Sequence, residues 1–241
     1  MEGGARQLRL LELFKGTGSI GKVAKKMGMS VMAIDILDKY EADVTADVLE
    51  WDYKKFFRDT GFIPDLLWAS PPCNTYSPMV YRLHERDPKT ARPLSKRAKE
   101  GTAILYRTLD IIKYCQKLNP DLIFCMENPK GMMRYDARIQ KETNRDTTLY
   151  CLYGDKRVKP TDFFNNLPGG LDLEEPALSK CPKEGRVGVI HDSSFRGPYT
   201  QATRTKNETE DITKNVEERY FIPPKLVKHI LKKMAAAYTQ S

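Results

Sequence analysis

This sequence has no cysteine pattern of the kind that holds a metal ion or a disulfide framework. Its five cysteines are an odd number, and none of them forms a Cys-x-x-Cys pair. Zinc sites and disulfide-rich domains usually place cysteines in such pairs or in even sets. We therefore expect no metal site, no disulfide framework and a reducing compartment. Cys115, Cys125 and Cys151 fall on apolar faces, where we expect them to pack.

The sequence also lacks a long apolar run and a secretion signal. No stretch approaches the roughly 18 residues that a membrane span needs. The first residues, MEGGARQLRLLELF, have no basic region followed by an apolar core and a small-residue cleavage site. We expect an intracellular protein that does not enter a membrane.

Negative charge is the scarcer of the two signs. The 241 residues include 40 Lys or Arg and 32 Asp or Glu, which gives a net charge of +8. A basic balance favours an anionic partner, and nucleic acid is the commonest one. Charge by itself does not identify that partner.

Short apolar runs alternate with helical patterns over the first 130 residues. The runs cover residues 8–14, 30–35, 64–70 and 121–127. Between the last two runs, segment 101–120 has the apolar spacing of a helix that Asn119-Pro120 ends. Strands that alternate with helices form parallel sheets covered on both faces. The sequence therefore predicts a mostly parallel, doubly wound α/β domain.

The remainder of the chain has a different organisation. Segments 147–154 and 160–166 have the composition of two more strands, and the stretch that follows is rich in loops. Residues 223–238 begin with proline and carry apolar side chains on one face of a helix. We expect a main domain over 1–165, a small loop-rich lobe over 166–218 and a C-terminal helix within 219–241.

Three glycines lie between the first strand and the helix that follows it. Gly16, Gly18 and Gly21 let the backbone turn tightly and approach a ligand at the start of the helix. Asp35 ends the second strand, where an acid can bind both ribose hydroxyls. Asp47 lies where a third strand would end and could accept from the adenine amine. A ligand-free glycine-rich turn is the simpler alternative. The two acids favour S-adenosylmethionine or NAD, although no hydride-transfer site is present.

The stretch LWASPPCNTYS places a thiol just beyond the third apolar run. Ligands of open α/β sheets bind outside the carboxyl ends of the strands, so Cys73 lies where a reaction would occur. Pro71 and Pro72 fix the backbone that leads to it. A nucleophilic cysteine needs its thiolate to be favoured. A buried, inert cysteine is the alternative.

Glu127 occupies the equivalent position at the end of the next strand, in CMENP. A carboxylic acid beside a nucleophilic thiol can protonate a ring nitrogen while the sulfur attacks the ring. The alternative is an acid that caps a turn.

A basic segment follows the candidate nucleophile. Residues 80–99 contain seven Lys or Arg and two acids. A basic loop beside an active site suits a lid over a phosphate backbone, whereas a solvated loop is the plain alternative. The candidate DNA contacts in it are Arg82, Arg86, Lys89, Arg92, Lys96 and Arg97.

In their order along the chain, these motifs resemble those of the DNA cytosine-5 methyltransferase family. LFKGTGSIG resembles the first cofactor motif, SPPCNTYS the Pro-Cys motif and CMENPKG the Glu-Asn-Val motif. YGDKRVKPTDFFNN resembles the later Arg-containing motif, and RYFIPPKLVKHIL the closing helix of short phage or viral members. The resemblance covers residues 8–166, with a weaker match at 219–231.

The resemblance implies a Rossmann-like, S-adenosylmethionine-dependent fold and a reaction on a cytosine flipped out of double-stranded DNA. Cys73 would add to C6, Glu127 would hold and protonate N3, and Arg157 would contact the base or a nearby phosphate. Lys159 would contact DNA. The implied cofactor residues are Phe14, Gly16, Thr17, Gly18, Ser19, Asp35, Ile36, Asp47, Val48 and Pro72.

The resemblance further implies that 1–165 is catalytic and that 166–218 recognises DNA. That region is short for sequence recognition, so a protein partner could supply specificity to an otherwise monomeric enzyme. We expect it in the nucleus, or in a host cell if it is viral. Asn74 stands where the family has Gln, Pro129 where it has Val, and Lys159 where a second Arg is common. The alternatives are an RNA (tRNA) cytosine-5 methyltransferase and an inactive DNA-binding scaffold.

Overall fold

The computed structural model of the chain describes residues 6–77, 83–177, 180 and 220–240. Within this part of the chain, no helix has the length and apolar character needed to cross a membrane. Most of the loop-rich lobe predicted for 166–218, and Arg82 of the basic segment, lie outside the described residues.

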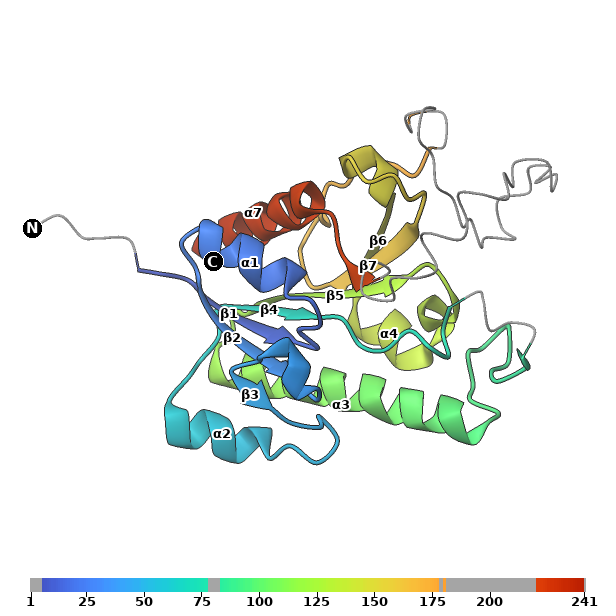
Figure 1. The fold of residues 1–241 in the computed structure, drawn as a ribbon, viewed down its shortest axis with the longest axis horizontal. Coiled ribbons are helices and arrows are strands. Elements are labelled where there is room, and N and C mark those ends of the chain that lie inside the picture. Colours follow the sequence, from blue (N-terminus) through green and yellow to red (C-terminus); the bar gives the residue numbers. More distant parts are fainter. Residues whose placement is uncertain (1–5, 78–82, 178–179, 181–219, 241) are drawn as a thin grey trace, which may run out of the picture.

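A seven-stranded sheet forms the centre of the structure, in the order β3-β2-β1-β4-β5-β7-β6 (Figure 1). Its strands are β1 (Arg9–Leu13), β2 (Ser30–Asp35), β3 (Val44–Thr45), β4 (Leu66–Ala69), β5 (Ile123–Pro129), β6 (Asn144–Leu149) and β7 (Pro160–Asn165). Strands β1 to β5 pair in parallel, whereas β7 runs antiparallel to β5 and to β6. The mostly parallel α/β sheet predicted from the sequence is confirmed.

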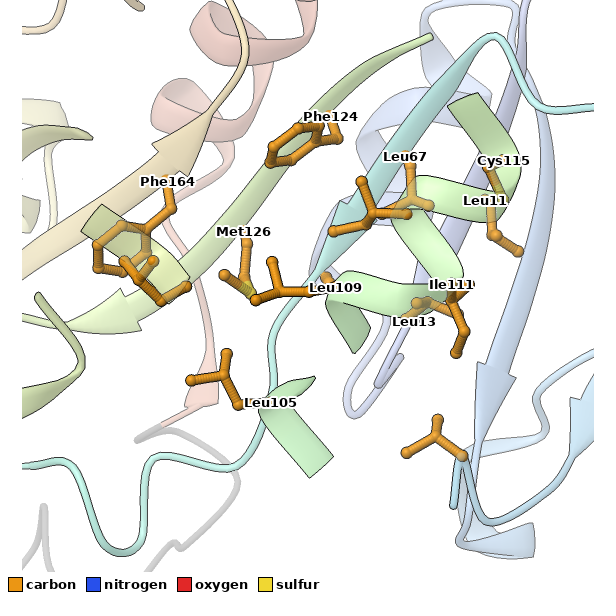
Figure 2. Packing of buried hydrophobic residues seen from close by; sticks show 14 of the residues in the cluster. Leu11, Leu13, Leu67, Leu105, Leu109, Ile111, Cys115, Phe124, Met126 and Phe164 are labelled. Atoms are coloured by element: carbon orange, nitrogen blue, oxygen red, sulfur yellow. The ribbon is translucent and has the colours of Figure 1, made fainter. Parts of the chain in front are cut away.

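Helices cover both faces of this sheet (Figure 1). On one face, α1 (Ser19–Lys26) and α7 (Pro224–Gln240) pack against an apolar cluster that includes Leu10, Leu66 and Trp68. On the other face, α2 (Tyr53–Thr60) and α3 (Lys96–Leu118) pack against Leu11, Leu13 and Leu67. The short helices are η1 (Asp38–Tyr40), η3 (Met132–Tyr135), α4 (Ala137–Glu142) and η4 (Tyr150–Tyr153). Figure 2 shows the packing on the face covered by α3, where Leu105, Leu109 and Cys115 of this helix lie among Leu67, Phe124 and Met126 of the sheet.

Local sequence explains where the longest helix begins and ends. The Ser95 hydroxyl accepts a hydrogen bond from the Ala98 amide at 3.0 Å, which caps the first turn of α3. The helix ends at Leu118 because Pro120 restricts Asn119, which adopts an extended conformation. This boundary agrees with the one predicted from the sequence.

The third glycine of the first motif has a packing role. The Gly21 amide donates to Glu12 Oε2 at 3.1 Å, and a Cβ on Gly21 would lie only 2.6 Å from that oxygen. Glu12 is buried on β1, and burial raises its pKa to about 7. Gly21 thus allows α1 to approach the sheet over a buried carboxyl group. The sequence had predicted that it serves the ligand.

Two expectations for the second half of the chain need correction. The predicted strand 147–154 is divided, because β6 ends at Leu149 and the chain turns through η4 to Gly154, which has a φ of +85°. The predicted strand 160–166 is confirmed as β7. Cys115, Cys125 and Cys151 are buried, as expected, and the first two are free. Cys151 is disulfide-bonded, which departs from the reduced state expected for the cysteines.

Candidate active site

The loop after β1 is shaped by left-handed backbone and by one carboxylate. Phe14, Gly16 and Gly18 have φ values of +61°, +50° and +71°, a region that favours glycine. Asp35, at the end of β2, accepts hydrogen bonds from the amides of Gly16 at 2.8 Å and Leu37 at 2.9 Å. Its buried carboxylate therefore joins the ends of β1 and β2 and fixes their loops at the carboxyl edge of the sheet.

The other residues predicted to bind a cofactor surround the same edge. Ile36 is 57% exposed immediately after Asp35, which leaves an apolar surface open to a ligand. Asp47 lies two residues beyond β3 and accepts from the Leu49 amide at 2.9 Å, while Val48 is buried. Thr17 and Ser19 share a hydrogen bond of 3.1 Å at the start of α1, and Pro72 is exposed on the next loop.

The loop after β4 presents Cys73 at the same edge. The Asn128 side chain donates to the carbonyl oxygen of Pro71 at 3.0 Å, and both residues are buried. The Cys73 carbonyl accepts from the amides of Tyr76 and Ser77, each at 3.0 Å, which closes a turn behind the thiol. A strand end, a buried amide and two prolines thus hold the half-buried thiol in one place.

Glu127 lies beside this loop because β4 and β5 are adjacent and parallel. Ala69 pairs with Met126, so the end of β4 and the position of Glu127 share one register. Glu127 is 7% exposed. Its Oε1 atom accepts a hydrogen bond from the Tyr150 hydroxyl at 3.0 Å and lies 3.7 Å from the Lys159 ammonium nitrogen.

The charges of these groups act on the thiol. Burial raises the pKa of Cys73 above its ordinary value, Lys159 lowers it, and Glu127 raises it. Cys73, Glu127 and Lys159 are therefore close enough to influence one another. The sequence predicts this proximity for Cys73 and Glu127. Lys159 is the local charge that favours the thiolate.

Arg157 and Lys159, on the turn between Gly154 and β7, make different contacts at the site. Arg157 forms an ion pair with Asp155 and donates to the carbonyl oxygen of Phe221 at 2.8 Å. Lys159, assigned from sequence to DNA, is the one that lies beside Glu127. Arg157 is oriented by an acid only two residues away, and its contact with the base or a nearby phosphate stays a prediction.

The assignment of Arg86 as a DNA contact needs correction, because its side chain is buried and not available to DNA. Its guanidinium carbon lies 3.6 Å from the centroid of the Tyr76 ring. Its nitrogens donate to Thr75, Thr102 and the carbonyl oxygens of Ala91 and Ala98. These bonds use all five of its N–H groups, so Arg86 anchors the basic segment to the protein.

The remaining basic candidates stay on the surface. Lys89, Arg92 and Lys96 are exposed, and Arg97 is exposed while it pairs with Glu85 at 2.8 Å. The pairing of Arg86 with Pro93 folds this segment into a hairpin, which Arg86 joins to Thr75 and Tyr76 of the loop after β4.

Tyr150 was missed from the sequence. Its ring is fully buried, with Lys159 4.8 Å and Arg157 5.4 Å from its centroid. Burial and the neighbouring Glu127 raise the pKa of its hydroxyl well above the ordinary value. It lay inside an apparent strand of apolar residues, and no local signal distinguished a hydroxyl that reaches an acid from an ordinary core tyrosine.

Comparison with known proteins gives one close relative over the whole length. The "Probable DNA (cytosine-5)-methyltransferase" of Frog virus 3 (isolate Goorha) is 31% identical over 232 residues, which cover 93% of this chain and 99% of that protein. No family model matches the chain.

Solved structures also match the chain over part of its length. An E. coli prophage protein described as a DNA modification methyltransferase matches with a TM-score of 0.47, 19% identity and 71% of this chain covered. The Dnmt2 methyltransferase of S. pombe matches with a TM-score of 0.45, 14% identity and 68% covered. The chain spans about half the length of these two structures, 51% and 52%.

Proposed function

Because this chain belongs to the DNA (cytosine-5)-methyltransferase family, we propose that it methylates C5 of cytosine in double-stranded DNA. In this proposal, Cys73 is the nucleophile, Glu127 is the acid that holds the base, and Lys159 and Tyr150 support them. The arrangement of Cys73 and Glu127 at the ends of adjacent strands is the observation that carries the proposal, since one pyrimidine ring must contact both.

The loops after β1 and β2 fit S-adenosylmethionine. The carboxylate of Asp35 is already fixed by two backbone amides, so it would accept the ribose hydroxyls without further ordering. The exposed side chain of Ile36 offers an apolar surface to adenine, and Asp47 offers an acceptor to its amine. Gly16 and Gly18, both with left-handed backbone, shape the loop that would hold the remainder of the ligand. When bound, S-adenosylmethionine supplies the electrophilic methyl group.

Cys73 activates the ring by forming a bond from its sulfur to C6. The electrons of the C5–C6 double bond then move toward C5, which becomes nucleophilic. Glu127 donates a proton or a hydrogen bond to N3, which offsets the negative charge that develops in the ring. After C5 has been methylated, a base removes the C5 proton, the double bond reforms and the thiolate leaves.

Lys159 and Tyr150 have supporting roles in this scheme. Lys159 lowers the pKa of the Cys73 thiol, and so favours the thiolate against the effect of burial. Tyr150 donates to one oxygen of Glu127, which leaves the second oxygen to face the base. Flipping the cytosine out of the duplex brings it to this edge.

Trapping with 5-fluorocytosine tests the proposal. A duplex that contains 5-fluorocytosine should form a stable adduct with the protein and cofactor, because fluorine cannot leave C5 as a proton does. Cys73→Ser should abolish the adduct and the transfer of labelled methyl groups while cofactor binding persists. Cys115→Ala, which changes a buried cysteine of α3, is the matched control and should still form the adduct.

The same assay separates the alternatives. Methylation of tRNA but not of duplex DNA would favour an RNA substrate. Tight DNA binding with neither adduct nor transfer would indicate an inactive scaffold. Equal transfer by wild-type protein and Cys73→Ser would refute the proposed chemistry.

A further inference from the structure

Most of the excess positive charge of this protein lies on two neighbouring helices. Helices α1 and α7 lie side by side on one face of the sheet (Figure 1). Helix α1 contains three lysines and α7 contains four, and neither contains Asp or Glu. The seven lysines of the two helices thus carry a charge of +7 with no acid within either helix, in a chain whose net charge is +8.

The lysines are arranged on the outside of the helices. In α7, Lys225, Lys228 and Lys232 are exposed, with the spacing of one helical face, whereas Leu226 and Ile230 are buried against the sheet. In α1, the exposed lysines are Lys22, Lys25 and Lys26. We name these six residues the lysine face. Like charges at such spacings destabilise a helix, so helix stability does not explain them.

Acidic neighbours do not neutralise this face. Among the residues that the structure describes, none of the six lysines forms an ion pair, and Lys22 donates instead to the carbonyl oxygen of Thr17 at 2.9 Å. The seventh lysine, Lys233, pairs with Asp172 at 2.7 Å and lies beside the face. An uncompensated cluster of this kind creates a positive field that attracts a polyanion.

The lysine face begins at the candidate active site. The Ile222 amide, just before α7, donates to the Ser19 hydroxyl at the start of α1 at 3.4 Å. Lys225 Nζ lies 3.6 Å from the position that a Cβ on Gly154 would take, on the turn before Arg157. Both helices therefore start at the edge where Cys73 and Glu127 lie, and they extend away from it.

We propose that the lysine face binds the phosphate backbone of the duplex that flanks the target cytosine. This inference rests on the proposed function and extends it to a second contact region. A helix of the length of α7, 17 residues, spans about 25 Å, which corresponds to roughly seven base pairs at 3.4 Å each. A duplex that is short on this side cannot reach the far lysines, whereas a longer one can.

The salt dependence of binding tests this proposal. Labelled duplexes of about 12 and 40 base pairs are titrated with wild-type protein and with Lys225→Gln/Lys228→Gln/Lys232→Gln at several salt concentrations. Each lost phosphate contact lowers the slope of log affinity against log salt by about 0.9. We expect the slope for the long duplex to fall by roughly 2 to 3. The slope for the short duplex should change little only when its target cytosine lies within about two base pairs of the end that faces α7, since Lys225 to Lys232 span about 10 Å.

A triple variant of α2 provides the matched control. Lys54→Gln/Lys55→Gln/Arg58→Gln removes three exposed cations from the opposite face of the sheet, so the net charge falls equally. We expect the α2 variant to retain the wild-type slope. Equal slopes for wild-type protein and the α7 variant on the long duplex, or equal losses in the two variants, would overturn the proposal.

Adduct formation with 5-fluorocytosine DNA, measured in parallel, separates this inference from the proposed function. If the wild-type protein forms the adduct and the α7 variant keeps its slope, the lysine face is not a DNA contact and an acidic protein becomes the better partner. If no adduct forms but the slope falls only in the α7 variant, the lysine face is supported and the proposed chemistry fails.

Discussion

The clearest prediction concerns the hydroxyl of Tyr150. Tyr150→Phe removes only the oxygen that donates to Glu127 at 3.0 Å, and it keeps the buried ring beneath Arg157 and Lys159. A hydrogen bond to a charged group contributes about 1.5 to 3 kcal/mol. If the whole of this is expressed at the transition state, kcat/KM falls by about tenfold to 150-fold, at roughly 1.4 kcal/mol per factor of ten.

The assay must separate positioning from stability. We expect Tyr150→Phe to slow adduct formation with 5-fluorocytosine DNA and to lower kcat, while the Kd for S-adenosylmethionine stays unchanged. Tyr153→Phe is the control, because Tyr153 lies in the same η4 turn and its hydroxyl accepts from the Glu174 amide, away from Glu127. Equal losses in the two variants, or a full rate in Tyr150→Phe, would refute the assigned role.

Three further predictions follow from charged side chains. Arg86→Lys breaks a buried network, so we expect a loss of about 3 kcal/mol and a fall in Tm of roughly 6 to 12 °C, with no change in the salt dependence of DNA binding. Lys159→Gln raises the pKa of Cys73, so alkylation by iodoacetamide at neutral pH should slow. Burial raises the pKa of Glu12 from 4.5 to about 7, so the native state binds this proton more tightly than the unfolded state does. The folding stability that this proton contributes is therefore lost as the pH rises from about 4.5 to about 7. The stability of Glu12→Gln relative to wild type should therefore increase by up to about 3 kcal/mol between pH 5 and pH 8 in urea unfolding.

The sheet was predictable because its signal is local. Each of the first, second, third and fourth apolar runs became a buried parallel strand, and the order of runs and helices fixed which edge holds the loops. The positions of Asp35, Cys73 and Glu127 followed from one rule, that strand ends of a parallel sheet meet at one edge. This rule needs no knowledge of side-chain contacts.

The directions of long basic side chains were not predictable in this way. Arg86 is one of several basic residues in a hydrophilic segment, and only the fold shows that Tyr76 and Thr75 from the nucleophile loop surround it. Arg157 carried a clearer signal. Asp155 lies two residues before Arg157 and accepts from both the amide and the side chain of Arg157, so the ion pair that orients Arg157 comes from adjacent residues of the sequence.

The C-terminal segment connects the two halves of the candidate site, which amphipathic spacing alone could not reveal. The apolar face of α7 explains only why the helix packs on the sheet. Just before it, the Ile222 amide donates to Ser19, which follows the loop after β1, and the Phe221 carbonyl accepts from Arg157, which lies near Tyr150. Arg157 also lies over the ring of Tyr150, whose hydroxyl donates to Glu127, so the segment before α7 is linked to Glu127 through Arg157 and Tyr150. If the proposed function holds, we therefore expect changes that loosen the packing of this helix to disturb the cofactor loop and the surroundings of Glu127 together, and so to slow methyl transfer, which requires both to be in place.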